Sequence, residues 1–190
     1  MEPSHVESTL FDAPAGLQKA LDLGYGYLHR RERTVGEVRA QLRRRGIAEE
    51  LAERAIRALV EQGAVDDERF AAMFVSDKRE LERWGTERIR RGLASRGVDR
   101  ELAERALLAA DSCAGGPADS PGGGPAGRTG GGEPGGEVQS ELDRALELLR
   151  RRCATPPVER HERERALGVL LRKGYEVELA LDALSAYARE

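Results

Sequence analysis

Aromatic residues and cysteines are scarce in this chain of 190 residues: aromatics make up 4% of it, and there are two cysteines. Neither Cys113 nor Cys153 has companion ligands at zinc spacing, and the pair provides no disulfide framework. The sequence also lacks a secretory signal and any apolar run near the roughly 18 residues of a membrane span. We therefore expect a protein of the reducing cytoplasm with neither a membrane segment nor a metal site.

Motifs for catalysis are missing as well. The three histidines, His5, His29 and His161, are scattered, and none has a partner at metal-binding spacing. The glycine-rich segment lacks the flanking strand, helix start and Lys-Ser/Thr ending of a phosphate-binding loop. Carboxylates alternate with arginines at helical spacing, which is typical of a solvated, salt-bridged helix face. The sequence therefore predicts no enzymatic activity and no cofactor.

Charged residues are abundant, at 34% of the chain, and 28 of the 31 basic residues are arginine. This profile favours long helices with narrow apolar faces over a thick globular core. The arginine bias is explained either by a GC-rich genome or by a need for bidentate contact with phosphate or carboxylate. The net charge of −3 combines a net +3 over residues 17–110 with −3 in each of 1–16 and 111–137. Global charge thus argues against a simple electrostatic coat on DNA.

The sequence repeats itself at a spacing of 51 residues. The run TVGEVRAQLRRRGIAEELAERAI at 34–56 aligns with GTERIRRGLASRGVDRELAERAL at 85–107, and ALGVLLRKGYEVELALDAL at 166–184 is a weaker third copy. Repetition at this length predicts an array of supersecondary units. Apolar residues recur at helical spacing without strand-like alternation. We therefore expect an all-α fold of three tandem three-helix repeats.

The boundaries of these parts follow from composition and periodicity. Residues 112–137 hold 11 of the 22 glycines and four of the eight prolines, too little apolar surface to offset the entropy of ordering. We expect a flexible tail at 1–16, a first repeat at 17–63 and a second repeat at 64–110. A disordered linker at 111–138 and a third repeat at 139–190 follow. The predicted helices are 17–32, 35–45, 48–62, 67–82, 86–96, 99–110, 139–152, 162–173 and 176–188.

Recurring turn residues support the helix boundaries. Thr34 and Glu37 form a capping-box pattern at the start of a helix. Gly46, Gly97 and Gly174 each follow a predicted second helix, where a left-handed residue ends the helix in a Schellman turn. We expect these residues to have structural roles.

Two adjacent acids, Asp66 and Asp67, stand between the first two repeats. Asp66 is placed to cap the helix that begins at Asp67, with Val65 and Phe70 as its hydrophobic staple. The alternative, a catalytic carboxylate pair, has no other residue to support it.

The second helix of each repeat is rich in arginine, and the third is net acidic. We predict a basic and an acidic surface along the array, with contact candidates Arg39, Arg43, Arg44, Arg88, Arg90, Arg91, Arg163 and Arg165. A cation near the end of a helix can simply complement the helix dipole, which is the alternative for Arg45, Arg96 and Lys173. Arg39 and Arg90 lie at matching mid-helix positions, so partner binding and plain solvation remain equal alternatives there.

Trp84, the single tryptophan, precedes Gly85 at the entry to the second helix of the second repeat. We expect it to anchor local packing. The alternative is that its ring stacks on a nucleic-acid base or on a partner protein.

Two segments resemble motifs of the RecX family. The run YGYLHRRERTVGEVRAQLRRRG at 25–46 is similar to the first motif, and GAVDDERFAAMFVSDKRELERWGTERIRRGLASRGV at 63–98 to the second. The resemblance covers residues 17–110 strongly and 139–190 more weakly. It implies three tandem three-helix repeats in a curved, elongated shape, without enzymatic activity.

The resemblance also implies a function. RecX proteins bind RecA along the groove of its filament on single-stranded DNA and restrain its ATPase and strand exchange in recombination and repair. Weak direct binding to single-stranded and double-stranded DNA is a further expectation, for a monomeric cytoplasmic protein. This chain departs from the family pattern by inserting about 26 residues before the third repeat, which puts the position of that repeat in doubt and would make it a tethered module.

A second hypothesis is a helix-turn-helix-like DNA-binding protein that acts without RecA. Three-helix units with a tight glycine turn and an arginine-rich helix also occur in such proteins. Base-reading side chains are few, however, because Gln41 and Ser95 are the only candidates on the two clearest second helices.

Overall fold

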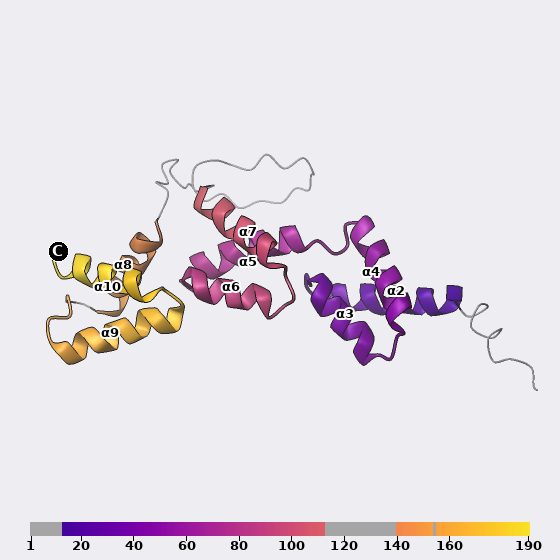
Figure 1. Ribbon diagram of the computed structural model, residues 1–190, viewed down its shortest axis with the longest axis horizontal. Coiled ribbons are helices and arrows are strands. Elements are labelled where there is room, and N and C mark those ends of the chain that lie inside the picture. The colour runs from indigo at the N-terminus through magenta and orange to yellow at the C-terminus, as the bar shows by residue number, and fades with distance from the viewer. Residues whose placement is uncertain (1–12, 113–139, 154) are drawn as a thin grey trace, which may run out of the picture. The chain divides into compact units, whose positions relative to one another are not determined.

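The computed structural model describes residues 13–112, 140–153 and 155–190, and every regular element in these ranges is a helix (Figure 1). The helices are α2 (Ala13–Leu28), α3 (Val35–Arg44), α4 (Glu49–Glu61), α5 (Asp67–Glu80), α6 (Thr86–Ala94), α7 (Arg100–Ser112), α8 (Glu141–Arg152), α9 (Arg160–Lys173) and α10 (Val177–Tyr187). The prediction of an all-α fold with three-helix repeats is therefore confirmed.

Most predicted helix ends lie within two residues of the observed ones, and α2 is the exception. It begins at Ala13, inside the predicted tail of residues 1–16, and ends at Leu28 instead of residue 32. Pro14 did not prevent this earlier start, because proline is tolerated in the first turn of a helix. The rest of that tail, residues 113–138 of the predicted linker and residue 139 of the predicted third repeat lie outside the described residues.

Two compact units divide the chain. The first comprises the residues up to Phe74 together with Gly92–Ala103, and the second comprises Val75–Arg91 and Glu104–Glu190. In the first unit, Val38, Leu42, Ala55 and Leu59 are at most 1% exposed. Their spacing of four residues places each pair on one face of α3 or α4, which is why these faces form the core.

The second unit has a core of its own around α8, α9 and α10. Leu149, Leu170, Ala180 and Ala183 are fully buried there, and Tyr175 is 2% exposed. Burial raises the pKa of the Tyr175 phenol to about 12.

Each second helix ends in the same left-handed turn. The φ angles of Gly46, Gly97 and Gly174 are +73°, +77° and +90°, a region that side chains with a Cβ rarely adopt. The next amide donates back to the carbonyl five residues earlier, as from Ile47 to Leu42 at 3.1 Å. The equivalent bonds run from residue 98 to 93 and from 175 to 170, both at 3.2 Å. These are Schellman-type helix ends.

The start of α3 lies against the turn after α6, and we call this contact the first joint (residues 34–36 against 96–97). The Thr34 hydroxyl is fully buried and donates a 2.5 Å hydrogen bond to the carbonyl oxygen of Arg96. The same hydroxyl accepts from the backbone N–H of Glu37 at 3.1 Å in a capping box. A Cβ atom on Gly36 would lie 2.7 Å from the Arg96 oxygen, so a side chain does not fit there.

The acids Asp66 and Asp67 cap two different helices. The carboxylate of Asp66 accepts hydrogen bonds from the first-turn amides of α5, at residues 68 and 69, at 3.0 and 2.9 Å. The carboxylate of Asp67 accepts a 2.8 Å bond from the backbone N–H of Val35, the first residue of α3. Burial raises the pKa of Asp67, and the bond from Val35 opposes that rise.

The start of α6 lies against the turn after α9, and this contact is the second joint (residues 85–87 against 173–174). The amides of Gly85 and Glu87 donate to the carbonyl oxygens of Lys173 and Gly174, at 2.9 and 3.2 Å. A Cβ atom on Gly174 would lie 2.3 Å from the Cβ of Arg88. In both joints, the backbone at the start of a second helix therefore packs directly against the backbone of a glycine turn.

An acid caps the helix start in the second joint too. Glu141 of α8 accepts a 2.8 Å hydrogen bond from the backbone N–H of Thr86, the first residue of α6. Thr86 is the repeat equivalent of Val35 at the spacing of 51 residues. A carboxylate from the following repeat thus satisfies one of the amides that a helix start leaves without a partner.

Candidate macromolecule-binding surface

The predicted contact arginines Arg39 and Arg90 are engaged within their own repeats. Arg39 donates to both carboxylate oxygens of Glu53 on α4, at 2.5 and 3.0 Å. Arg90 makes the equivalent pair with Glu104 on α7, at 2.5 and 3.2 Å, and a further ion pair with Glu87. Each guanidinium thus joins the second helix of its repeat to the third, a role that neither alternative, partner binding or plain solvation, had included.

The pKa values follow this pairing. The hydrogen bond with Glu53 raises the pKa of Arg39, and the same bond lowers the pKa of Glu53. The bond with Glu104 raises the pKa of Arg90 in the same way. Between these helices the predicted basic and acidic surfaces are neutralised pair by pair, so a partner would have to compete with a bidentate carboxylate.

Arg43 and Arg88 also have partners. Arg43 is exposed and donates to both oxygens of Glu49, at 3.0 and 2.8 Å, and this bond raises the pKa of Arg43. Arg88 is half-buried, with its guanidinium 4.2 Å from the centre of the Trp84 ring and its Nη1 donating to the carbonyl oxygen of Arg172 at 2.8 Å. Trp84 therefore stacks within its own chain, with Lys78 4.9 Å from its centre.

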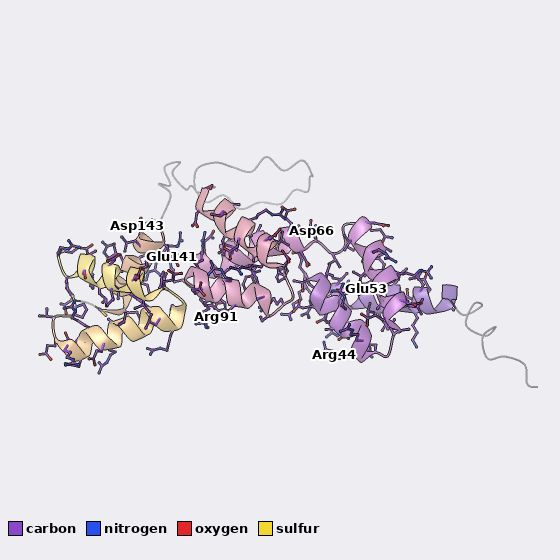
Figure 2. All side chains as sticks on the ribbon, in the orientation of Figure 1. Arg44, Glu53, Asp66, Arg91, Glu141 and Asp143 are labelled. Carbon is purple, nitrogen blue, oxygen red and sulfur yellow. The ribbon has the colours of Figure 1, made fainter. Side chains whose placement is uncertain are left out.

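Four of the predicted contact arginines are exposed and form no ion pair with any residue that the structure describes: Arg44, Arg91, Arg163 and Arg165. Arg44 lies at the end of α3 and Arg91 near the end of α6 (Figure 2). The side chain of Arg91 donates to the backbone carbonyl of Glu87 at 3.2 Å, which leaves its charge unneutralised. Arg163 and Arg165 lie on α9. Each second helix thus offers at least one cation that can bind an anionic group without breaking an internal ion pair.

Sequence reasoning missed two buried arginines. Arg79 of α5 and Arg144 of α8 are 6% and 7% exposed, and both reach Asp111 near the end of α7, at 2.8 and 3.3 Å. Burial lowers the pKa of Arg79, and the neighbouring charge of Arg144 lowers it further. Asp111 had been placed in the predicted linker, and no sequence signal distinguishes these arginines from exposed ones.

The described residues also bear on membranes and metals. None of the described helices is long and apolar enough to cross a bilayer. In the same ranges, no group of three or more histidine, cysteine, aspartate or glutamate side chains is arranged to hold a metal ion.

Two family models match successive parts of the chain. The model for the first three-helix domain of RecX matches residues 20–59, and the model for the second three-helix domain matches residues 66–107. The matched ranges include α3 and α6, which carry most of the predicted contact arginines.

Relatives named "Regulatory protein RecX" share this similarity. The one from Prosthecochloris aestuarii is 34% identical over 97 residues, which cover 51% of this chain and 64% of the relative. The one from Amycolatopsis mediterranei is 29% identical over 177 residues, which cover 91% of this chain and 85% of the relative. The chain thus spans less than two thirds of the former relative and most of the latter.

A solved structure has the same fold. The crystal structure of RecX from Lactobacillus salivarius superposes with a TM-score of 0.68 at 18% identity, over 93% of this chain and 99% of that one.

Proposed function

Because the chain belongs to the RecX family, we propose that it regulates a RecA recombinase by binding RecA and its filament on single-stranded DNA. In this proposal the protein inhibits the RecA ATPase and strand exchange in recombination and repair, in the cytoplasm and without chemistry of its own. The observation that carries the proposal is the presence of both RecX three-helix domains, in order, over residues 20–107.

The exposed second-helix arginines are the proposed contacts. Arg44, Arg91, Arg163 and Arg165 carry charge that no described carboxylate neutralises. A guanidinium of this kind binds a phosphate or a carboxylate through two parallel hydrogen bonds. Arg39, Arg43, Arg88 and Arg90 stay in the proposed set as weaker members, since each would first have to leave an internal partner.

Sequence-specific DNA binding without RecA is the second candidate, and the side chains that would read bases do not favour it. The Ser95 hydroxyl, one residue after the end of α6, donates to the carbonyl oxygen of Gly92 at 2.9 Å. Gln41 is only half-exposed and lines a cavity between α2 and α3. Neither side chain is presented as a free pair of donor and acceptor for a base edge.

The test is the rate of ATP hydrolysis by RecA on single-stranded DNA, measured against the concentration of this protein. We expect the wild type to lower the rate. Replacing Arg44, Arg91, Arg163 and Arg165 by alanine should raise the concentration for half-inhibition by at least about tenfold, because several charged contacts are lost together.

The matched control removes the same number of charges from third helices. Arg54, Arg57, Arg100 and Arg105 are exposed on α4 and α7, and their replacement by alanine should change the half-inhibition concentration by less than about twofold. Equal losses in the two variants would show that only overall charge matters. A wild-type protein that leaves the RecA ATPase unchanged would refute the proposed function.

A further inference from the structure

A polar cavity of about 440 Å³ opens between α2 and α3 in the first unit. Three arginines line it, together with one carboxylate and two neutral polar side chains: Arg30, Arg33, Arg45, Asp22, Gln41 and Tyr27. Its charged lining therefore carries a net excess of two positive charges. A space of this size falls within the range of small-molecule binding sites, about 300–1,000 Å³.

Of the three arginines in this cavity, only Arg33 forms an ion pair with a described residue. The side chain of Arg33 is 12% exposed, with its guanidinium 4.3 Å from the centre of the Tyr27 ring and an Nη1 atom 3.6 Å from Glu37. Its Nε is buried and has no hydrogen-bond acceptor among the described residues. Arg30 and Arg45 are exposed and pair with no described carboxylate. Because Arg33 lines the cavity, a small rotation of its side chain would bring this unpaired N–H to a ligand oxygen.

In the second repeat, the arginine equivalent to Arg45 is covered by an aromatic ring. At the spacing of 51 residues, Leu23 becomes Phe74 and Arg45 becomes Arg96. Phe74 is 8% exposed, and the guanidinium of Arg96 lies 4.7 Å from the centre of its ring. Arg96 also donates to the carbonyl oxygen of Gly92 at 2.7 Å. The equivalent arginine is thus covered by an aromatic ring, whereas the smaller Leu23 leaves Arg45 open in the first repeat.

We propose that this cavity binds a phosphate monoester, such as the 5′-phosphate of a nucleotide. A monoester carries a charge between about −1.5 and −2 near neutral pH and offers three acceptor oxygens, one for each of the three lining arginines, whereas a carboxylate offers two oxygens and a single charge. Arg30 and Arg45 bind the phosphate oxygens from the open side, and the Nε of Arg33 donates to the oxygen that enters deepest. The phosphate comes from a free nucleotide or from the 5′ end of a DNA strand.

The site is independent of the proposed function, because its test uses no RecA. The full-length protein is titrated with deoxyadenosine 5′-monophosphate and, separately, with a short oligonucleotide that has a 5′-phosphate. Deoxyadenosine and the same oligonucleotide without the 5′-phosphate are the controls. The readout is the NMR resonance of the Arg33 Nε–H, which should move with a phosphorylated probe and stay in place with its control. The probe that binds more tightly identifies the source of the phosphate.

Two pairs of variants separate the cavity from general surface charge. Replacing Arg30 and Arg45 by alanine should weaken binding by at least about tenfold, because two charged hydrogen-bond partners are lost. Replacing Arg31 and Arg54, which are exposed in the same unit but do not line the cavity, removes the same charge and should change binding by less than about twofold. Leu23→Phe keeps every charge and introduces the ring that covers Arg96 in the second repeat, so it should also weaken binding.

The site is supported if the Arg33 resonance moves with either phosphorylated probe, and if this movement is lost in the Arg30/Arg45 variant and kept in the Arg31/Arg54 variant. Equal weakening in both double variants would overturn it, since only surface charge would then matter. A resonance that stays in place with both phosphorylated probes would overturn it as well.

Discussion

The two joints share one backbone design and differ in their side chains. In each, a glycine turn meets the start of a second helix, and an acid from the first helix of the following repeat caps that start. The first joint relies on the Thr34 hydroxyl and on close glycine packing. An ion pair lies beside each joint, Glu32 with Arg69 at 3.1 Å and Arg83 with Glu147 at 3.0 Å. The second joint also has Asp111 nearby, between two buried arginines.

The difference follows the connections in the chain. The helices of the first joint belong to repeats joined directly through residues 62–66, whereas residues 113–139 separate α7 from α8. Closing the longer connection costs about 1–2 kcal/mol more in chain entropy. The ion pairs of Asp111 with Arg79 and Arg144 lie on the side of this longer connection. Through these pairs, Asp111 of α7 links α8 to α5 across the longer connection.

The largest effect is expected from a side chain at Gly174. Its φ of +90° and a Cβ position 2.3 Å from the Cβ of Arg88 make Gly174→Ala both strained and overpacked. We expect a loss of about 3 kcal/mol in the free energy of unfolding, measured by urea denaturation. Gly46→Ala is the matched control, since its φ is +73° but nothing lies within 4 Å of the added Cβ, and it should cost about 1 kcal/mol. Equal losses would show that close packing at the joint contributes nothing.

The next effect concerns the charges of the second joint. Asp111→Ala leaves Arg79 and Arg144 buried together without their shared carboxylate, and we expect a loss of about 2 kcal/mol. Hydrogen exchange should quicken in α8 and α9 while α3 keeps its protection. Glu80→Ala, an exposed acid on α5, is the control and should leave both regions unchanged. Quicker hydrogen exchange in α3 with α8 unaffected would contradict the expectation that Asp111 stabilises the packing of α8.

A smaller effect is expected at the carboxylate of the first joint. Asp67→Ala removes the acceptor for the Val35 amide and should cost about 1 kcal/mol, whereas Asp67→Asn keeps an acceptor and should cost less. Burial raises the pKa of Asp67, so the folded protein holds that proton more tightly than the unfolded chain. The stability of the wild type relative to Asp67→Asn should therefore fall as pH rises from below about 4 through the raised pKa. A rise in relative stability over this window would mean that the carboxylate is favoured in the fold.

The smallest effect is expected at the partly exposed pair of Arg39 and Glu53. A double-mutant cycle with Arg39→Met and Glu53→Gln should give a coupling energy below about 1 kcal/mol that weakens with salt. The equivalent cycle at Arg90 and Glu104 should give a similar value, since both side chains have similar exposure. A coupling well above this range at either pair would mean that the ion pair is essential to the repeat.

Local signals in the sequence predicted the helices and their ends. The capping box of Thr34 and the turns at Gly46 and Gly97 involve groups within a few residues, so their spacing is enough to place the helix ends. The bond from Thr34 to Arg96 spans 62 residues and could not be predicted in this way. Asp67 bonds to an amide 32 residues away, and Asp111 binds arginines on two other helices. The pairing of Arg39 with Glu53 likewise depends on how α3 packs on α4. Contacts of this kind are set by tertiary packing, and arginine spacing on one helix does not contain that information.

The most direct test of the account is the affinity of the protein for RecA filaments compared with bare DNA. Labelled single-stranded DNA, alone or coated with RecA in the presence of a non-hydrolysable ATP analogue, is titrated with the protein, and binding is followed by cosedimentation. We expect the protein to bind the RecA-coated strand at least about tenfold more tightly than the bare strand. Replacing Arg44, Arg91, Arg163 and Arg165 by alanine should remove most of that difference in affinity. Equal affinity for coated and bare DNA, or tighter binding to bare DNA, would contradict it.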